Sequence, residues 1–69
     1  MKAISRKEFV RKFRALGFEA PKRAGAHLFM RRGSIYIRIP EVEKLEISGG
    51  LQWALLRQLE IDMPVWEMA

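Results

Sequence analysis

Residues 27–40 read HLFMRRGSIYIRIP, and this stretch decides the fold. In its second half isoleucines alternate with other residues, so they fall on one face of an extended strand while Tyr36 and Arg38 fall on the other. The Arg-Arg-Gly sequence is typical of a tight turn, and the proline ends the second strand because it has no amide proton to donate. We predict an antiparallel hairpin with strands over residues 27–31 and 34–39, preceded by a loop over residues 21–26.

The turn between these strands sets which side chains share a face. A two-residue loop of Arg32 and Gly33 would place His27 opposite Arg38, on the face away from the isoleucines. A three-residue loop with Gly33 as the bulge residue would instead pair His27 with Ile37. The second loop suits the sequence better, since Arg32 then does not need a positive φ. In both registers His27 begins the first strand.

A helix is predicted ahead of the hairpin, between Ile4 and Phe18. Ser5 and Glu8 form an S-x-x-E capping box, in which each side chain bonds to the backbone amide of the other residue. Gly17 supplies the left-handed position that commonly ends a helix. Phe9, Phe13 and Leu16 follow at helical spacing and predict an apolar stripe that faces the core. Ile4 is predicted to pack against Phe9 as a hydrophobic staple.

After the hairpin the chain predicts one long helix and one short one. Ser48 caps the long helix, and Asp62 with Pro64 begins the short one. The apolar face of the long helix is predicted to consist of Leu51, Leu55 and Leu59, widened by Trp53, Ala54 and Leu56. A loop or a short third strand is expected before Ser48, around Glu41, Glu43 and Glu46.

The predicted order of elements is therefore α-β-β-(β)-α-(α). A small antiparallel sheet buries one face most economically under helices. We predict a single α+β domain over residues 1–69, with the other face of the sheet open.

The charge is divided unevenly along the chain, whose net charge is +5. Residues 1–38 carry 11 Lys or Arg against 2 Glu, whereas residues 39–69 carry 2 against 6 acidic residues. Such asymmetry indicates a face that binds polyanions and a less basic side for packing or a partner. Charge that serves solubility alone is the simpler alternative.

The composition excludes several kinds of site. There is no cysteine and only one histidine, so disulfides and thiolate or paired-histidine metal sites are not expected. No phosphate-binding glycine loop or nucleophile elbow occurs, so we expect no cofactor. No apolar run approaches the roughly 20 residues that span a bilayer, and the chain leads directly into a helix signal without a secretory leader. We therefore expect a cytoplasmic protein.

His27 is the candidate for chemistry, because histidine exchanges protons near neutral pH. Removing the proton of a ribose 2′-hydroxyl lets that oxygen attack the neighbouring phosphorus without a metal, while cations stabilise the growing charge on the phosphate. Basic residues surround His27 in the sequence: Lys22, Arg23, Arg31, Arg32 and Arg38. From residue types alone, a structural histidine at a strand start is the favoured alternative.

Other side chains predict contacts with RNA. Tyr36 can stack on an unpaired base beside positive charge, although a tyrosine that merely covers a sheet is equally ordinary. The outward face of the first helix carries a basic ridge, which we define as Lys7, Arg11 and Arg14. Trp53 and Trp66 have apolar neighbours and are expected in the core or at a partner interface.

These motifs follow one another in a recognisable order along nearly the whole chain. A Ser-x-x-Glu helix start leads to Gly-Phe at 17–18, followed by GAHLF at 25–29, IRIP at 37–40 and a helix over residues 51–61. In this order the chain resembles the HicA, or YcfA-like, family of bacterial and archaeal messenger-RNA interferase toxins. His27 matches the second histidine of the family motif, while Ala26 replaces the first.

The resemblance implies a double-stranded-RNA-binding-domain-like α-β-β-β-α fold and metal-independent RNA cleavage by a histidine. It also implies a type II toxin–antitoxin system, with a HicB-like antitoxin as partner. We expect an endoribonuclease in which His27 transfers the proton and the basic ridge makes secondary contacts, while RNA is held by Lys22, Arg23, Arg31, Arg38 and Tyr36.

Two other interpretations remain open. One is a non-catalytic RNA-binding module of the same fold. The other is an interaction protein whose apolar segment from Met63 to Met68 binds either a partner protein or a second copy of the chain. The basic charge favours either RNA interpretation over the last.

Overall fold

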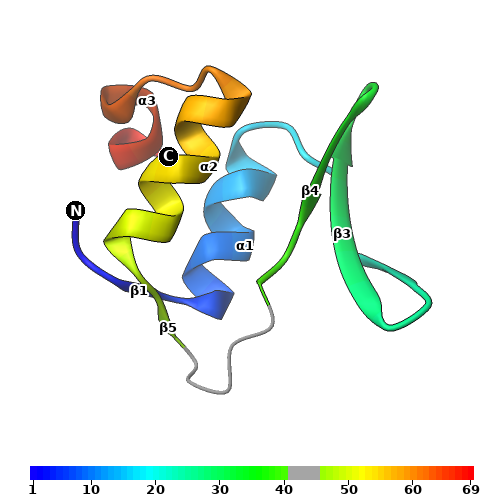
Figure 1. The fold of residues 1–69 in the computed structure, drawn as a ribbon. Helices are drawn as coiled ribbons and strands as arrows, with labels where there is room; N and C mark the ends of the chain where they lie inside the picture. The colour runs from blue at the N-terminus through cyan, green and yellow to red at the C-terminus, as the bar shows by residue number, and fades with distance from the viewer. Residues whose placement is uncertain (41–45) are drawn as a thin grey trace.

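The computed structural model describes residues 1–40 and 46–69. Within these residues, three helices and five short strands form an α+β fold with antiparallel sheets, as predicted (Figure 1). In chain order the elements are β1 (Ile4–Ser5), α1 (Arg6–Ala15), β2 (Lys22–Ala24), β3 (His27–Arg32), β4 (Ile35–Arg38), β5 (Glu46–Ile47), α2 (Gly49–Leu59) and α3 (Met63–Met68).

Both ends of α1 follow the capping rules. The Glu8 amide donates to the Ser5 hydroxyl oxygen at 3.0 Å, as predicted, while the Glu8 carboxylate accepts from Arg11 rather than serving the cap. Gly17 adopts a φ of +94°, and the Phe18 amide donates to the Phe13 carbonyl oxygen at 3.0 Å. This six-residue closure is the Schellman motif, and it fixes where the chain leaves the helix.

The three-stranded sheet has the order β2-β3-β4 and is built from two hairpins with two-residue loops. Each loop begins with a glycine at positive φ, Gly25 at +60° and Gly33 at +61°, which is the arrangement of a type II′ turn. The second loop therefore consists of Gly33 and Ser34, and Met30 pairs with Ile37. Both predicted registers are wrong. The two-residue alternative nevertheless assigned the faces correctly, because it differs from the observed register by an even number of residues.

β2 is a strand where a loop was expected. Its three residues are all exposed and show no apolar alternation, so the sequence carries no strand signal there. They become a strand because the tight turn at Gly25 folds them back onto β3, with Lys22 opposite Phe29 and Ala24 opposite His27.

The short strand expected before the second helix is also present, but it pairs elsewhere. β5 lies antiparallel to β1, with Ile4 opposite Ile47, and forms a separate two-stranded sheet. The observed order β-α-β-β-β-β-α-α thus differs from the predicted α-β-β-(β)-α-(α). Glu41 and Glu43 of the predicted loop lie outside the described residues, and Glu46 begins β5.

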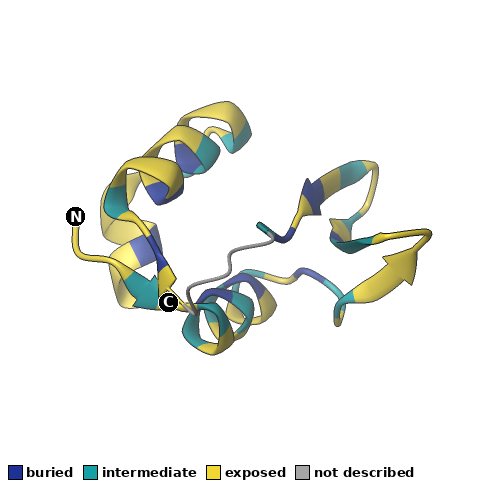
Figure 2. Cartoon of the chain, turned by 60° about the horizontal axis from the view of Figure 1, so that its bottom comes forward, coloured by how far each residue is buried: buried dark blue, intermediate teal, exposed yellow. Residues whose placement is uncertain are grey.

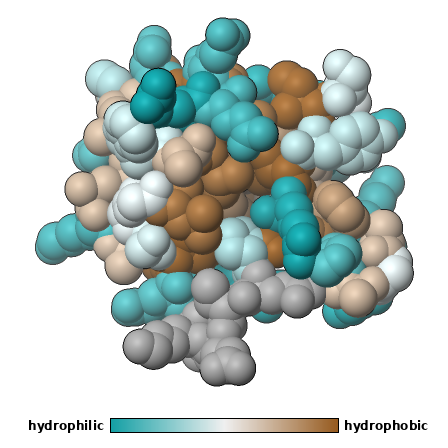
Figure 3. Space-filling view, viewed as in Figure 1, coloured by the Kyte–Doolittle hydropathy of each residue, from teal (hydrophilic) through white to brown (hydrophobic). Residues whose placement is uncertain are grey.

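The core lies where α1 meets the inner face of the sheet and the C-terminal helices. Figure 1 shows α1 between the β3–β4 hairpin and the pair α2 and α3. Buried positions, dark blue in Figure 2, occur on the helices and strands that meet there, whereas β2 has none. In the view of Figure 3, apolar side chains gather in the middle of the face and hydrophilic ones surround them. The buried cluster consists of Phe9, Phe13, Phe18, Met30, Ile37, Ile39, Ile47, Leu56 and Trp66.

The buried face of α2 is rotated from the predicted one. Ser48 caps the helix through the Leu51 amide, at 3.2 Å, as predicted. However, Leu51 is exposed and Leu55 and Leu59 are only partly buried, while Gln52 and Leu56 point inward. Gln52 is tolerated in the core because its amide is fully used: it donates to the carbonyl oxygens of Lys2 and Ile47 and accepts from Trp66.

The described helices are also short. None of those in residues 1–40 and 46–69 has the length and apolar character that a membrane span requires.

Candidate nucleic-acid interface

The two faces of the three-stranded sheet carry different chemistry. Side chains alternate along a strand, and residues that oppose each other across a ladder point to the same face. Met30 and Ile37 are paired and buried, so their face is the inner one. The observed pairings therefore bring most of the predicted site residues to the outer face, in three sets: His27 with Ala24, Phe29 with Lys22 and Arg38, and Arg31 with Tyr36.

An open groove of about 520 Å³ lies on this outer face. Three predicted site residues of the outer face line it, one from each strand: Lys22, Arg31 and Tyr36. Arg23 also borders the groove, but it pairs with Leu28, so its side chain starts from the opposite face of the edge strand β2. Phe29, Ala20 and Ala24 add apolar surface, and Glu19 adds a carboxylate. The groove thus combines two aromatic rings, three cations and one anion.

Glu19 is the groove residue that the sequence analysis missed. Its amide donates to the Arg31 carbonyl oxygen at 2.7 Å, and its carboxylate accepts from the Arg31 Nε at 2.7 Å. The Lys22 Nζ lies 3.5 Å from the other carboxylate oxygen. The Arg31 guanidinium first, and the Lys22 ammonium more weakly, hold the pKa of Glu19 below its ordinary value. Glu19 is therefore ionised at neutral pH.

His27 lies beside the groove at the start of β3. It is half-buried, faces Ala24 across the ladder, and meets the Phe29 ring edge-on, with centroids 6.4 Å apart and planes at 87°. Both of these neighbours line the groove. The imidazole is therefore adjacent to the groove, because Ala24 and Phe29 both neighbour His27 and line the groove.

Arg38 and Arg32 occupy opposite faces although they lie on neighbouring strands. Arg38 is exposed on the outer face, opposite Phe29. Arg32 points inward, donates to the Leu16 carbonyl oxygen at 3.0 Å and stacks 4.9 Å from the Phe18 ring centroid. Arg32 thus secures the C-terminal end of α1, and of these two arginines Arg38 is the one available on the outer side.

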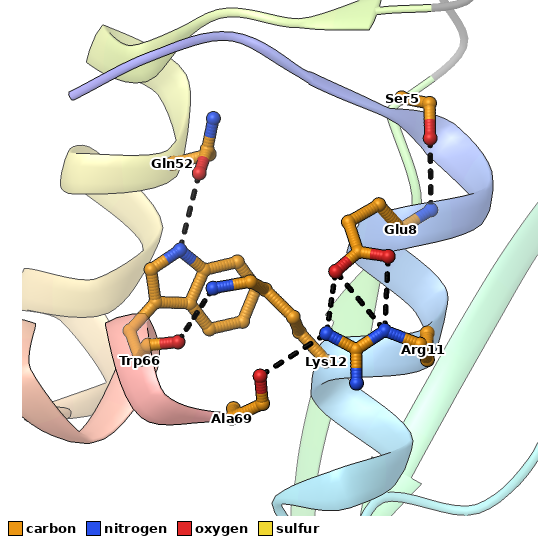
Figure 4. Close-up of polar contacts among 7 residues, drawn as sticks. All are labelled: Ser5, Glu8, Arg11, Lys12, Gln52, Trp66 and Ala69. Carbon is orange, nitrogen blue, oxygen red and sulfur yellow. Dashed lines mark hydrogen bonds and ion pairs between the residues drawn. The ribbon is translucent and has the colours of Figure 1, made fainter.

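The basic ridge lies on α1, apart from the sheet. Lys7 and Arg14 are exposed, but Arg11 is paired with Glu8 and also donates to the Ala69 carbonyl oxygen at 3.1 Å (Figure 4). The neighbouring Lys12 donates to the Trp66 carbonyl oxygen at 2.7 Å. Two α1 cations are therefore used to hold α3, which leaves Lys7 and Arg14 as the available part of the ridge.

No cluster of three or more His, Cys, Asp or Glu that could hold a metal ion occurs within residues 1–40 and 46–69. What the outer face presents is positive charge, which attracts phosphates, and aromatic rings, on which bases stack. An imidazole stands at its border. Comparison of the chain with protein-family models, with curated proteins and with solved structures finds no match.

Proposed function

We propose that this chain is a HicA-like messenger-RNA interferase, the toxin of a type II toxin–antitoxin system in the cytoplasm. In this proposal it cleaves RNA without a metal and is neutralised by a HicB-like antitoxin. The finer fold assignment, a variant of the double-stranded-RNA-binding-domain-like arrangement, belongs to the same proposal. The observation that supports it is the position of His27, next to a groove lined by Lys22, Arg23 and Arg31.

The proposed reaction uses the neutral imidazole of His27 as the base. The imidazole accepts the proton of a ribose 2′-hydroxyl, and the 2′-oxygen forms a bond to the adjacent phosphorus as the bond to the 5′-oxygen breaks. The products are a 2′,3′-cyclic phosphate and a 5′-hydroxyl, whose proton comes from a lysine, a tyrosine or water. Cations at the rim of the groove stabilise the charge on the phosphate oxygens.

The RNA is proposed to lie across the outer face of the sheet. Lys22, Arg23, Arg31 and Arg38 hold phosphates, and Tyr36 stacks on a base. Lys7 and Arg14 extend the contact along the ridge. Binding of this kind weakens as the salt concentration rises, because phosphate contacts release counterions.

A non-catalytic RNA-binding module is the second candidate, and a specific observation favours it. Ala26 stands where the family motif has its first histidine, and it occupies the second position of the β2–β3 turn. The outer face would still bind RNA with one histidine missing, but the chemistry would be impaired.

Substitution of His27 separates the two candidates. We expect His27→Ala and His27→Gln to abolish cleavage of a labelled messenger RNA and growth arrest on expression, while RNA affinity changes little. Gln can keep a hydrogen bond but cannot act as a base near neutral pH. Thermal unfolding of both variants checks that the half-buried position tolerates the change. Cleavage that persists in both folded variants would refute the catalytic role, and a wild type that binds RNA without cutting it would support the binding module.

A further inference from the structure

We propose that Glu19 makes the groove selective for guanine in single-stranded RNA. This inference rests on the proposed function, because it specifies which base the RNA-binding surface accepts. It is independent of the cleavage step. It follows from the position of an ionised carboxylate between aromatic and cationic groove residues.

The Glu19 carboxylate is held in place and yet remains accessible. Its backbone is bonded to β3 through the Arg31 carbonyl oxygen, and its side chain is bonded to the Arg31 guanidinium. The side chain is nevertheless 41% exposed. A carboxylate offers about four acceptor positions, and Arg31 and Lys22 occupy two of them. About two acceptor positions therefore remain for a ligand.

An ionised carboxylate can only accept hydrogen bonds, and this property distinguishes the bases. Guanine presents two adjacent donors on its Watson–Crick edge, N1–H and the N2 amino group. Adenine and cytosine present one donor beside an acceptor, and uracil presents one donor between two acceptors. Two adjacent carboxylate oxygens therefore match guanine alone and are repelled by an acceptor on each of the other three bases.

The remaining groove residues suit a base that stands in this orientation. Phe29 and Ala24 provide an apolar floor, and Tyr36, which is 63% exposed, provides a ring on which the base can stack. Lys22 and Arg31 each have further donors besides those used on Glu19, and these can take the flanking phosphates or the guanine O6. A base in a duplex cannot reach Glu19 in this way, because its Watson–Crick edge is already paired. The groove therefore selects single strands.

The test compares guanine with hypoxanthine, which lacks only the N2 amino group. Binding of the wild-type chain is measured on oligouridines that carry one central guanosine, inosine or adenosine. Their 2′-oxygens are methylated, so they cannot be cleaved. We expect guanosine to bind about tenfold more tightly than inosine, since a bidentate contact to a base provides about 1–3 kcal/mol of discrimination. We expect adenosine to bind at least as weakly as inosine.

Two matched variants assign the preference to Glu19. Glu19→Gln should bring the guanosine to inosine ratio close to one. Glu8→Gln removes a carboxylate that is likewise paired with an arginine but lies on α1, away from the groove, and it should leave the ratio unchanged. Equal binding of guanosine and inosine by the wild type, or a preference that survives Glu19→Gln, would overturn the inference and leave RNA binding intact. Failure to bind all three oligonucleotides would overturn the proposed function with it.

Discussion

Aromatic rings meet cations and a polar side chain in two regions of this molecule, with opposite results. Around Trp66 the indole is 2% exposed, its Nε1–H donates to Gln52 at 3.1 Å, and the Lys12 ammonium lies 4.9 Å from its ring centroid (Figure 4). In the groove, Tyr36 and Arg31 are exposed and Glu19 retains acceptor capacity. An aromatic ring, a cation and a polar side chain thus meet in both regions, but they are buried in one and accessible in the other.

The difference lies in whether the fold itself satisfies the polar atoms. The Trp66 cluster joins α1, α2 and α3, and each of its polar groups has a partner inside the protein. Such a network stabilises the fold, and its donors and acceptors are already paired and so are not available to a ligand. The groove lies on the sheet face away from the described helices (Figure 1), so its donors and acceptors remain accessible. Residue type therefore identifies neither region, and accessibility separates them.

The largest expected effect comes from a substitution in the buried cluster around Trp66. Trp66→Ala removes the central side chain of the core cluster, and we expect it to lower the free energy of unfolding by about 3–5 kcal/mol. A chain of this size has a total of only about 3–10 kcal/mol, so the variant should be close to unfolded at room temperature. Urea denaturation followed by far-UV circular dichroism measures the loss.

Trp53→Ala is the matched control for this prediction. Trp53 is 46% exposed and is covered by Arg57, whose guanidinium carbon lies 4.7 Å from the ring centroid. A surface substitution of this kind changes stability by about 0.5 kcal/mol or less. If the two tryptophan variants were equally destabilised, the contrast between a closed and an open aromatic cluster would be wrong.

The next effect concerns the open region and binding rather than stability. Tyr36→Ala removes a stacking ring from the groove, and we expect RNA affinity to fall by roughly tenfold, since stacking contributes about 1–3 kcal/mol per base. Unfolding should shift by about 0.5 kcal/mol or less, because the ring is mostly exposed. Fluorescence anisotropy with a labelled single-stranded RNA measures the affinity. Tyr36→Phe keeps the ring and should bind RNA nearly normally. If Tyr36→Ala lost stability but kept its RNA affinity, the ring would contribute to the fold rather than to RNA binding.

The sequence predicted the local structure that depends on neighbouring residues. The caps at Ser5 and Ser48 and the end of α1 at Gly17 are all confirmed, because each requires residues only a few positions apart. The register of the hairpin was not predicted. Gly33 followed by Ser34 carries the type II′ signature, and weighing that signature would have found the turn.

Features that depend on distant partners escaped the sequence analysis. Hydropathy placed Leu51 on the apolar face of the second helix and left Gln52 out of it, whereas three hydrogen bonds with residues outside this helix hold Gln52 inside. Charge and aromatic character named Lys22, Arg31 and Tyr36 as candidate RNA contacts, but the sequence did not predict that strand pairing brings them to one groove. Glu19 was not named, because its two cationic partners lie on strands that follow it in the chain, one of them in a segment predicted as a loop.

The smallest expected effect is a dependence of stability on pH. The guanidinium of Arg11 lowers the pKa of Glu8, and that of Arg31 lowers the pKa of Glu19, relative to the ordinary value of 4.5. A carboxylate whose pKa is lowered by folding stabilises the native state above its ordinary pKa, and this contribution is lost as the pH falls through the lower value. We therefore expect the thermal midpoint to fall below about pH 4.5, and to fall less in the double variant Glu8→Gln, Glu19→Gln. Both ion pairs are exposed, so the wild type and the double variant should differ only slightly in how far the thermal midpoint falls. This difference should vanish in 1 M salt, where the Debye length is about 3 Å. A difference that persisted in 1 M salt would show that these carboxylates stabilise the protein through packing rather than through charge. Glu19 would then serve the fold, as the residues around Trp66 do, rather than remain available to a ligand.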